Sequence, residues 1–189
     1  PNRTMLVYST RGNFTTADSN LGFITGVFTT PTLLTFERGG TSTTRTNVRF
    51  EVVEWSQESG VTVTSGLSTV NTSAGSGIDF AHGATVTTDN TFLYSQSRHE
   101  DNGLEQCSMR VAFDSTNITA DRYDTTNTYT SHVAWQLIMF PADICQKKTP
   151  VTGSNTTTAI DTTVSTIDID KTIVWSTNNT NGQGTSMGR

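Results

Sequence analysis

The chain has 189 residues and a mass of 20.5 kDa. With 33% hydrophobic and 15% charged residues, it is neither an unusually hydrophobic chain nor a charge-rich disordered one. Threonine supplies 39 residues, and this excludes an ordinary helical protein because β-branched residues fit strands better than helices. The net charge of -5 and the scattered arginines leave no basic surface for nucleic acid. The longest apolar stretch, Val133–Phe140, is interrupted by Gln136 and is too short to span a bilayer.

Three short blocks recur along the chain in the same order. The pairs of similar blocks are 4–9 with 91–95, 34–38 with 118–122, and 48–55 with 133–140. Their spacings are 87, 84 and 85 residues, and the first block returns once more, 81 residues on, at 172–176. Colinear blocks at near-equal offsets predict an internal duplication.

Each copy is predicted to be antiparallel β-structure. Apolar and polar residues alternate in 48–52, 61–64 and 167–170, as in half-buried strands. Turn residues such as Gly39-Gly40 and 101–103 separate the strands. Because no helical periodicity is present, we expect an all-β fold of tandem antiparallel β-sandwich repeats.

The aromatic-rich strands that end at Trp55 and Phe140 are predicted to form the centre of each core. Alternation along these strands places four side chains on one side of them: Phe50, Val52, Trp135 and Leu137.

The phase of the repeat predicts three units. Residues 1–55 hold the second part of a repeat, 56–140 a complete repeat, and 141–189 the first part of a further one. Either the chain is a slice of a longer tandem array, or the C-terminal part of one chain completes the N-terminal part of the next. That second arrangement is a strand exchange between subunits, which does not close and therefore grows a filament. A third possibility is a division after about Asn90, giving two tandem domains and a tail.

The strands 48–55 and 133–140 resemble a β-repeat of large secreted bacterial proteins, in which a Trp-Gln-Val-Val-Glu-Phe-like strand precedes a Val-x-Val-x-x-Gly segment. Residues 61–66 match that segment, whereas 145–149 replace it in the second copy. The resemblance implies a role in a surface or appendage and brings no catalytic residues. Residues 110–135 also resemble the last strands of an H-type lectin sandwich.

Scarce lysine, abundant threonine and glycan acceptor sites together favour an extracellular protein, and in that setting a pair of cysteines usually forms a disulfide. Cys107 and Cys145 are predicted to form a disulfide, the alternative being two unrelated buried thiols. Six sequons offer glycosylation sites at Asn2, Asn13, Asn71, Asn117, Asn155 and Asn178. Scarce lysine and abundant threonine agree with a cell surface, an appendage or a virion fibre.

Calcium is the one cofactor that the sequence suggests. Its candidate ligands are Asp101 and Asn102 in a tight loop and Asp168 and Asp170 on one strand face, because calcium takes hard oxygen ligands. The alternative is a polar turn and a solvated strand face whose charge discourages edge pairing. No other metal or cofactor is expected.

Other chemistry-bearing residues are interpreted as structural. We expect His82, His99 and His132 to be solvated, because they lack metal-ligand spacing. Arg38 and Arg122 follow acidic residues at equivalent strand ends and are expected to close turns. The three tryptophans are expected to pack in cores, with a carbohydrate platform as the alternative: Trp55, Trp135 and Trp175.

No catalytic motif is present, so we expect no enzyme. The sequence predicts a non-enzymatic extracellular structural protein that forms or decorates a fibre, filament or appendage. Its expected partners are copies of itself, joined head-to-tail. The alternative is a carbohydrate-binding adhesin or lectin-like module, for example on a phage fibre, with glycans as ligands.

Overall fold

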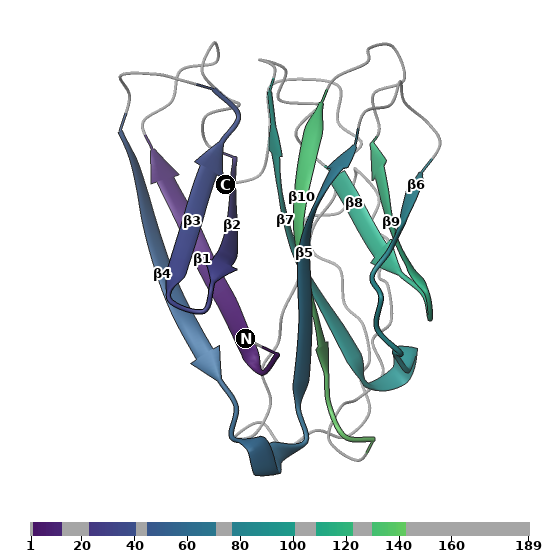
Figure 1. Cartoon of the computed structure of the whole chain (residues 1–189). Coiled ribbons are helices and arrows are strands. Elements are labelled where there is room, and N and C mark those ends of the chain that lie inside the picture. Colours follow the sequence, from purple (N-terminus) through teal and green to yellow (C-terminus); the bar gives the residue numbers. More distant parts are fainter. Residues whose placement is uncertain are drawn as a thin grey trace, which may run out of the picture.

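The computed structural model describes residues 2–12, 23–40, 45–70, 77–100, 109–122 and 130–142. These residues form β-strands and short 3₁₀ turns (Figure 1). The strands are β1 (Thr4–Gly12), β2 (Ile24–Thr30), β3 (Leu33–Arg38), β4 (Thr46–Glu54), β5 (Thr62–Val70), β6 (Ile78–Ala81), β7 (Thr91–His99), β8 (Met109–Phe113), β9 (Asn117–Arg122) and β10 (Ser131–Met139). The 3₁₀ turns are η2 (Gln57–Ser59) and η3 (Thr88–Asn90). The prediction of an all-β, antiparallel, sandwich-like fold is confirmed.

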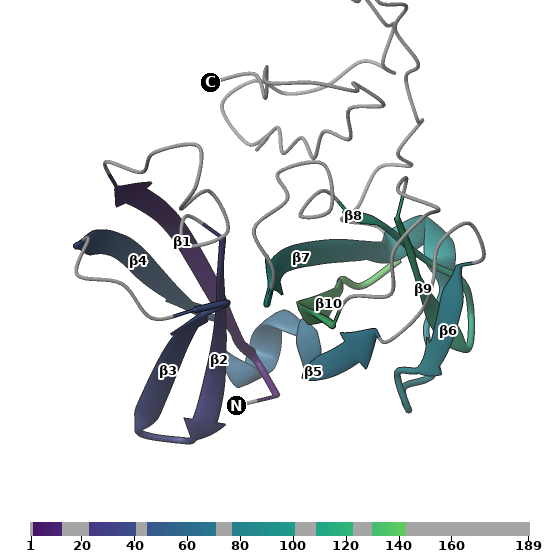
Figure 2. The same cartoon turned by 90° about the horizontal axis from the view of Figure 1, so that it is seen from above.

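The strands pair into small antiparallel sheets that lie against one another (Figure 2). In the first half of the described chain, β1 pairs with β4 and β2 pairs with β3. In the second half, β10 lies between β5 and β7, while β9 lies between β6 and β8. No helix in the described ranges is both long and apolar enough to cross a membrane.

Strand β10 is the centre of the molecule because both of its faces are covered. Trp135 and Leu137 point toward the β6–β9–β8 sheet and pack with Ile118. On the opposite face, Ile138 packs with Leu6 and other residues of the first half. A strand buried on both faces needs apolar side chains at successive positions rather than at alternate ones. This explains the unbroken run of apolar residues from 137 to 140.

The two halves share one pairing scheme. Leu6 lies opposite Val52 in the β1–β4 pair, and Leu93 lies opposite Leu137 in the β7–β10 pair. The hairpins β2–β3 and β8–β9 also correspond. In each hairpin, the first residue of the first strand lies opposite the arginine that ends the second strand: Ile24 opposite Arg38, and Met109 opposite Arg122. In the second half, β5 and β6 are added to the outer edges of β10 and β9. No described strand takes these two places in the first half.

This difference corrects the expected position of one predicted core strand. Trp135 and Leu137 are buried at the centre, as predicted. Phe50 and Val52 share one side of β4, as the alternation predicts, but they are 50% and 47% exposed. The prediction that β4 is central was wrong, because β4 pairs only with β1 within the described residues.

Candidate functional site

The inner edge of β1 is closed by side chains instead of a neighbouring strand. The Leu6 N–H donates to Gln136 Oε1 at 2.8 Å, and Gln136 Nε2 donates to the Leu6 carbonyl oxygen at 2.7 Å. Two residues along, the Tyr94 hydroxyl accepts from the Tyr8 N–H and donates to the Tyr8 carbonyl oxygen, both at 3.3 Å. A side-chain amide and a phenol therefore satisfy backbone groups that another strand would otherwise pair.

These contacts fix the direction of the backbone groups on the outer side of β4. Hydrogen-bonded and non-hydrogen-bonded pairs alternate along an antiparallel ladder. Leu6 and Tyr8 direct their N–H and C=O groups toward the second half, so the residues opposite them, Val52 and Phe50, direct theirs away from β1. Val48 lies two residues further on and shares this direction. We call this side of the strand, with Val48, Phe50 and Val52, the β4 edge.

The β4 edge is apolar and exposed. Val52 and Phe50 lie about half exposed, and the Phe50 ring contacts the Phe36 ring of β3 at 5.6 Å between centroids. Val53 on the other face of β4 is 38% exposed, and Leu33 at the start of β3 is 54% exposed. Four of the five large apolar side chains that are exposed in the described residues thus belong to β3 and β4. Unpaired, apolar strand edges favour the addition of another strand.

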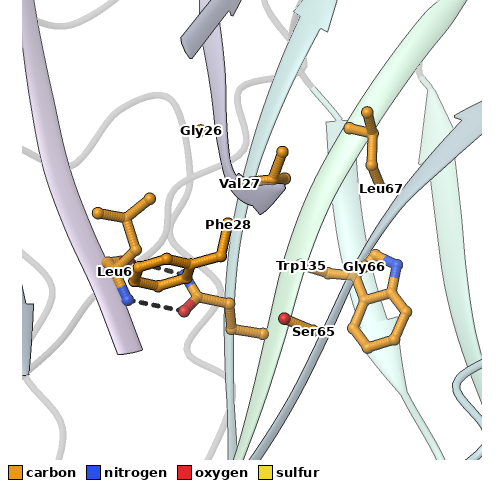
Figure 3. Close-up of a pocket in the computed structure, with 9 residues that line it drawn as sticks. Leu6, Gly26, Val27, Phe28, Ser65, Gly66, Leu67 and Trp135 are labelled. Atoms are coloured by element: carbon orange, nitrogen blue, oxygen red, sulfur yellow. Dashed lines mark hydrogen bonds between the residues drawn. The ribbon is translucent and has the colours of Figure 1, made fainter. Parts of the chain in front are cut away.

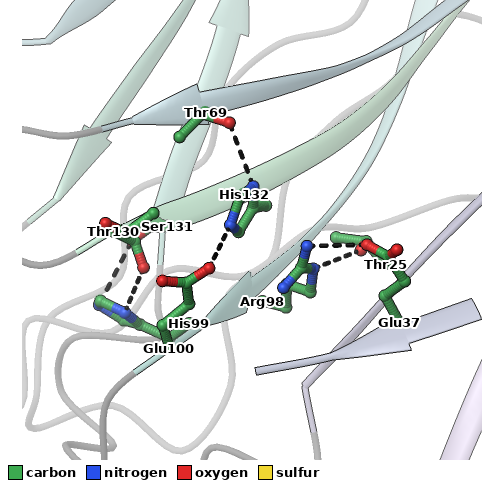
Figure 4. Close-up of polar contacts among 9 residues, drawn as sticks. All are labelled: Thr25, Glu37, Thr69, Arg98, His99, Glu100, Thr130, Ser131 and His132. Atoms are coloured by element: carbon green, nitrogen blue, oxygen red, sulfur yellow. Dashed lines mark hydrogen bonds and ion pairs between the residues drawn. The ribbon is translucent and has the colours of Figure 1, made fainter. Parts of the chain in front are cut away.

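A polar cluster joins the two halves. Arg98 of β7 donates from Nη2 to Glu37 Oε2 at 2.8 Å and from Nε to Thr25 Oγ1 at 3.1 Å (Figure 4). In the second half, Asp121 occupies the place of Glu37 and forms an ion pair with Arg110. At both positions the carboxylate of the acidic residue links neighbouring strands, while the turn-closing role of Arg38 and Arg122 stays a prediction.

The histidines are less solvated than expected. His82 and His99 are buried, so the prediction of solvated histidines was wrong for both. His99 lies within hydrogen-bonding distance of the Thr130 carbonyl through Nδ1 and of Ser131 Oγ through Nε2 (Figure 4). Because Ser131 is also buried, this serine–histidine contact offers no accessible nucleophile. His132 is half-buried, and its Nε2 lies 2.8 Å from Glu100 Oε1.

A small pocket lies between the two halves. Its volume is about 150 Å³, and its lining includes Leu6 and Phe28 from the first half and Leu67 and Trp135 from the second (Figure 3). Gln136, which bonds to Leu6, also lines it. Sites for drug-sized ligands are generally larger, from about 300 Å³ upward. The pocket is therefore a packing gap where β2 approaches β5.

Few of the predicted site residues lie in the described ranges. Asn2 is exposed, whereas Asn117 is half-buried and its Nδ2 donates to Thr116 Oγ1 at 3.1 Å. Trp135 is buried, and Trp55 packs edge-on against Phe140. Outside the described residues lie both cysteines, all four calcium candidates and the remaining sequons and tryptophan: Cys107, Cys145, Asp101, Asn102, Asp168, Asp170, Asn13, Asn71, Asn155, Asn178 and Trp175. Their predicted roles remain predictions.

Within the ranges that the structure describes, no three His, Cys, Asp or Glu side chains gather closely enough to hold a metal ion. Comparisons of the chain with protein families, curated proteins and solved structures give no match. The β4 edge is the feature that the sequence did not single out as a site. The signal for it was the predicted repeat, in which the strand 48–55 corresponds to the central strand 133–140.

Proposed function

We propose that the chain is a non-enzymatic structural protein of an extracellular fibre, filament or appendage, whose copies join head-to-tail through β-strand addition. The observation that carries the proposal is the β4 edge. It combines outward-directed backbone groups with half-exposed Phe50 and Val52, in a half-sandwich that the described residues leave open.

The shared pairing scheme supports the tandem repeat behind this proposal. Blocks that correspond in sequence occupy corresponding places in the β1–β4 and β7–β10 pairs. In the second half, β5 and β6 complete the sheets. The first half has the corresponding strand pairs, but none of its described strands lies in the places of β5 and β6. A neighbouring copy that supplied them would make both halves alike.

The extracellular setting rests on composition. The chain has 39 threonines and only three lysines, and its sequons offer sites for glycans. Hydroxyl-rich solvent faces keep a long β-assembly soluble without many charges. The cysteine pair, Cys107 and Cys145, would add a disulfide in an oxidising compartment.

Electron microscopy and sedimentation of the purified native chain test the proposal. Filaments or a concentration-dependent series of oligomers are expected, and denaturation should return chains of 20.5 kDa. Discrete small particles at all concentrations would count against a structural filament. Binding of those particles to a glycan array would then favour the carbohydrate-binding adhesin.

A further inference from the structure

The fold already contains one strand that passes from one half to complete the other. After β4 ends, the chain makes the turn η2 and enters β5, which pairs with β10 of the second half instead of with β4. Trp55 and Phe140, which follow β4 and β10, pack against each other at 6.1 Å between ring centroids. Strands β4 and β10 therefore end at the same end of the molecule, and the strand that follows β4 pairs with β10 of the second half.

The segment after β10 contains a sequence that matches β5. Residues 159–167 read Ala-Ile-Asp-Thr-Thr-Val-Ser-Thr-Ile, and β5 reads Thr-Val-Thr-Ser-Gly-Leu-Ser-Thr-Val. Aligned without gaps, Ile160 corresponds to Val63, Val164 to Leu67 and Ile167 to Val70. Val63 and Val70 of β5 are buried, whereas Leu67 is exposed. The segment therefore has apolar side chains at both of the aligned positions that β5 buries.

We propose that residues 159–167 of one copy add to the β4 edge of a second copy, in the place that β5 occupies beside β10. This rests on the proposed head-to-tail assembly and names its donor and acceptor. The forward direction follows from the chain itself, since β5 leaves the first half and completes the unit that comes later in sequence. The register of β5 on β10 would place Ile160 opposite Val53, as Val63 lies opposite Ile138.

The added strand would pair with the outward side of β4 and place an apolar side chain beside Val53. Ile160 would lie beside Val53, which is 38% exposed, and the backbone of the incoming strand would pair with the outward groups of Phe50 and Val52. In the same register Asp161 would lie opposite Val52 and Thr163 opposite Phe50, so the apolar contact of the incoming strand is that of Ile160 with Val53.

Full-length variants test this donor and acceptor. Val52→Pro with Val53→Lys removes the acceptor, because it deletes an outward N–H of β4 and places a charge opposite Ile160. Ile160→Lys with Val164→Lys removes the donor. Leu67→Lys is the matched control, because Leu67 is an equally exposed apolar strand residue, at 42%, away from β4. In sedimentation velocity, the assembled fraction of each double variant alone is expected to be at least about tenfold lower than that of the unchanged chain. The control should assemble like the unchanged chain. Circular dichroism verifies that every variant is folded.

Mixing the two double variants makes the test specific. The acceptor variant keeps its donor segment and the donor variant keeps its β4 edge, so the mixture should form dimers of one copy of each and nothing larger. Undiminished assembly of both variants would overturn the inference and leave the proposed filament intact. If the unchanged chain itself remained a monomer, the proposed function would fail as well. Folded variants that stay monomeric in the mixture would overturn the pairing of this donor with this acceptor.

Discussion

Gln136 shows how one polar residue organises the contact between the two halves. In the sequence it only interrupts an apolar stretch. In the structure its amide bonds to both the N–H and the C=O of Leu6, and the whole group is buried. A buried backbone donor or acceptor without a partner costs about 1–3 kcal/mol.

Replacing Gln136 by leucine should therefore destabilise the chain, because both backbone groups of Leu6 lose their partner. We expect the free energy of unfolding to fall by about 2–5 kcal/mol, measured by urea denaturation. Gln57→Leu is the control, because Gln57 is exposed on η2 and should change stability by less than about 0.5 kcal/mol. Equal stability of the two variants would show that the Leu6 contacts do not matter.

The tyrosine pair gives the chain an alkaline sensitivity. Burial raises the pKa of Tyr8 far above its ordinary value, and burial also raises the pKa of Tyr94. The Tyr8 hydroxyl donates to the Ile24 carbonyl oxygen and accepts from the Gly26 N–H, so its neutral form fits the site. Below about pH 10, tyrosines are protonated in both the folded and the unfolded chain.

Above that pH, the unfolded chain releases protons that the folded chain retains, so stability should fall as pH rises. For each tyrosine that is protonated only in the folded chain, the free energy of unfolding falls by up to about 1.4 kcal/mol per pH unit. Urea denaturation at a series of pH values measures the slope, and ultraviolet titration follows the phenolate. Titration of all four tyrosines of the native chain near pH 10 would contradict this prediction.

At the scale of strands, β4 and β10 show how far sequence reasoning reaches. Their similar patterns correctly predicted that both are strands and which side chains share a face. The pattern of one strand reports which faces are apolar, but not which neighbours flank it. β5 follows β4 along the chain but pairs with β10 instead, and no local sequence pattern indicates this choice of partner. The β4 edge could therefore be suspected from the repeat phase but not placed on a particular strand.

The pairing of β5 with β10 depends on Gly66, which lies opposite Trp135. A Cβ atom there would lie 2.5 Å from Cζ2 of the Trp135 ring, which is closer than real contacts allow. Gly66→Ala should displace the indole and lower the free energy of unfolding by about 1–3 kcal/mol, as overpacking does. Ser65→Ala is the neighbouring control, because Ser65 is exposed on the same strand. Thermal denaturation with tryptophan fluorescence checks both the loss and the movement of the ring.

At the scale of the whole molecule, the two halves are joined by a shared core. Ile138 of β10, Tyr94 of β7 and Val63 of β5 pack in one cluster with Leu6 and Tyr8 of β1. The ion pair between Arg98 and Glu37 adds a polar connection at the surface. Among the described strands, the first half has only two-stranded sheets, which are marginal alone, so it depends on this core for its stability.

Ile138→Ala should consequently weaken both halves together. We expect a loss of about 2–5 kcal/mol, as for other large-to-small core changes, and a single unfolding transition in calorimetry. Leu67→Ala, at an exposed position, should cost much less. Two separate transitions in the variant, with the second half unaffected, would show that the halves are stable independently.

The closure of the inner edge of β1 by Gln136 and Tyr94 has a consequence for geometry. It leaves the β1–β4 sheet with a single side to extend, because side chains already occupy the other. In the proposed assembly each copy would therefore accept one strand and donate one, so the copies would form an unbranched line with two different ends. The copy at one end would keep an unfilled β4 edge, and the copy at the other end an unused donor segment. Such a filament would be polar, and its two ends would present different surfaces for growth.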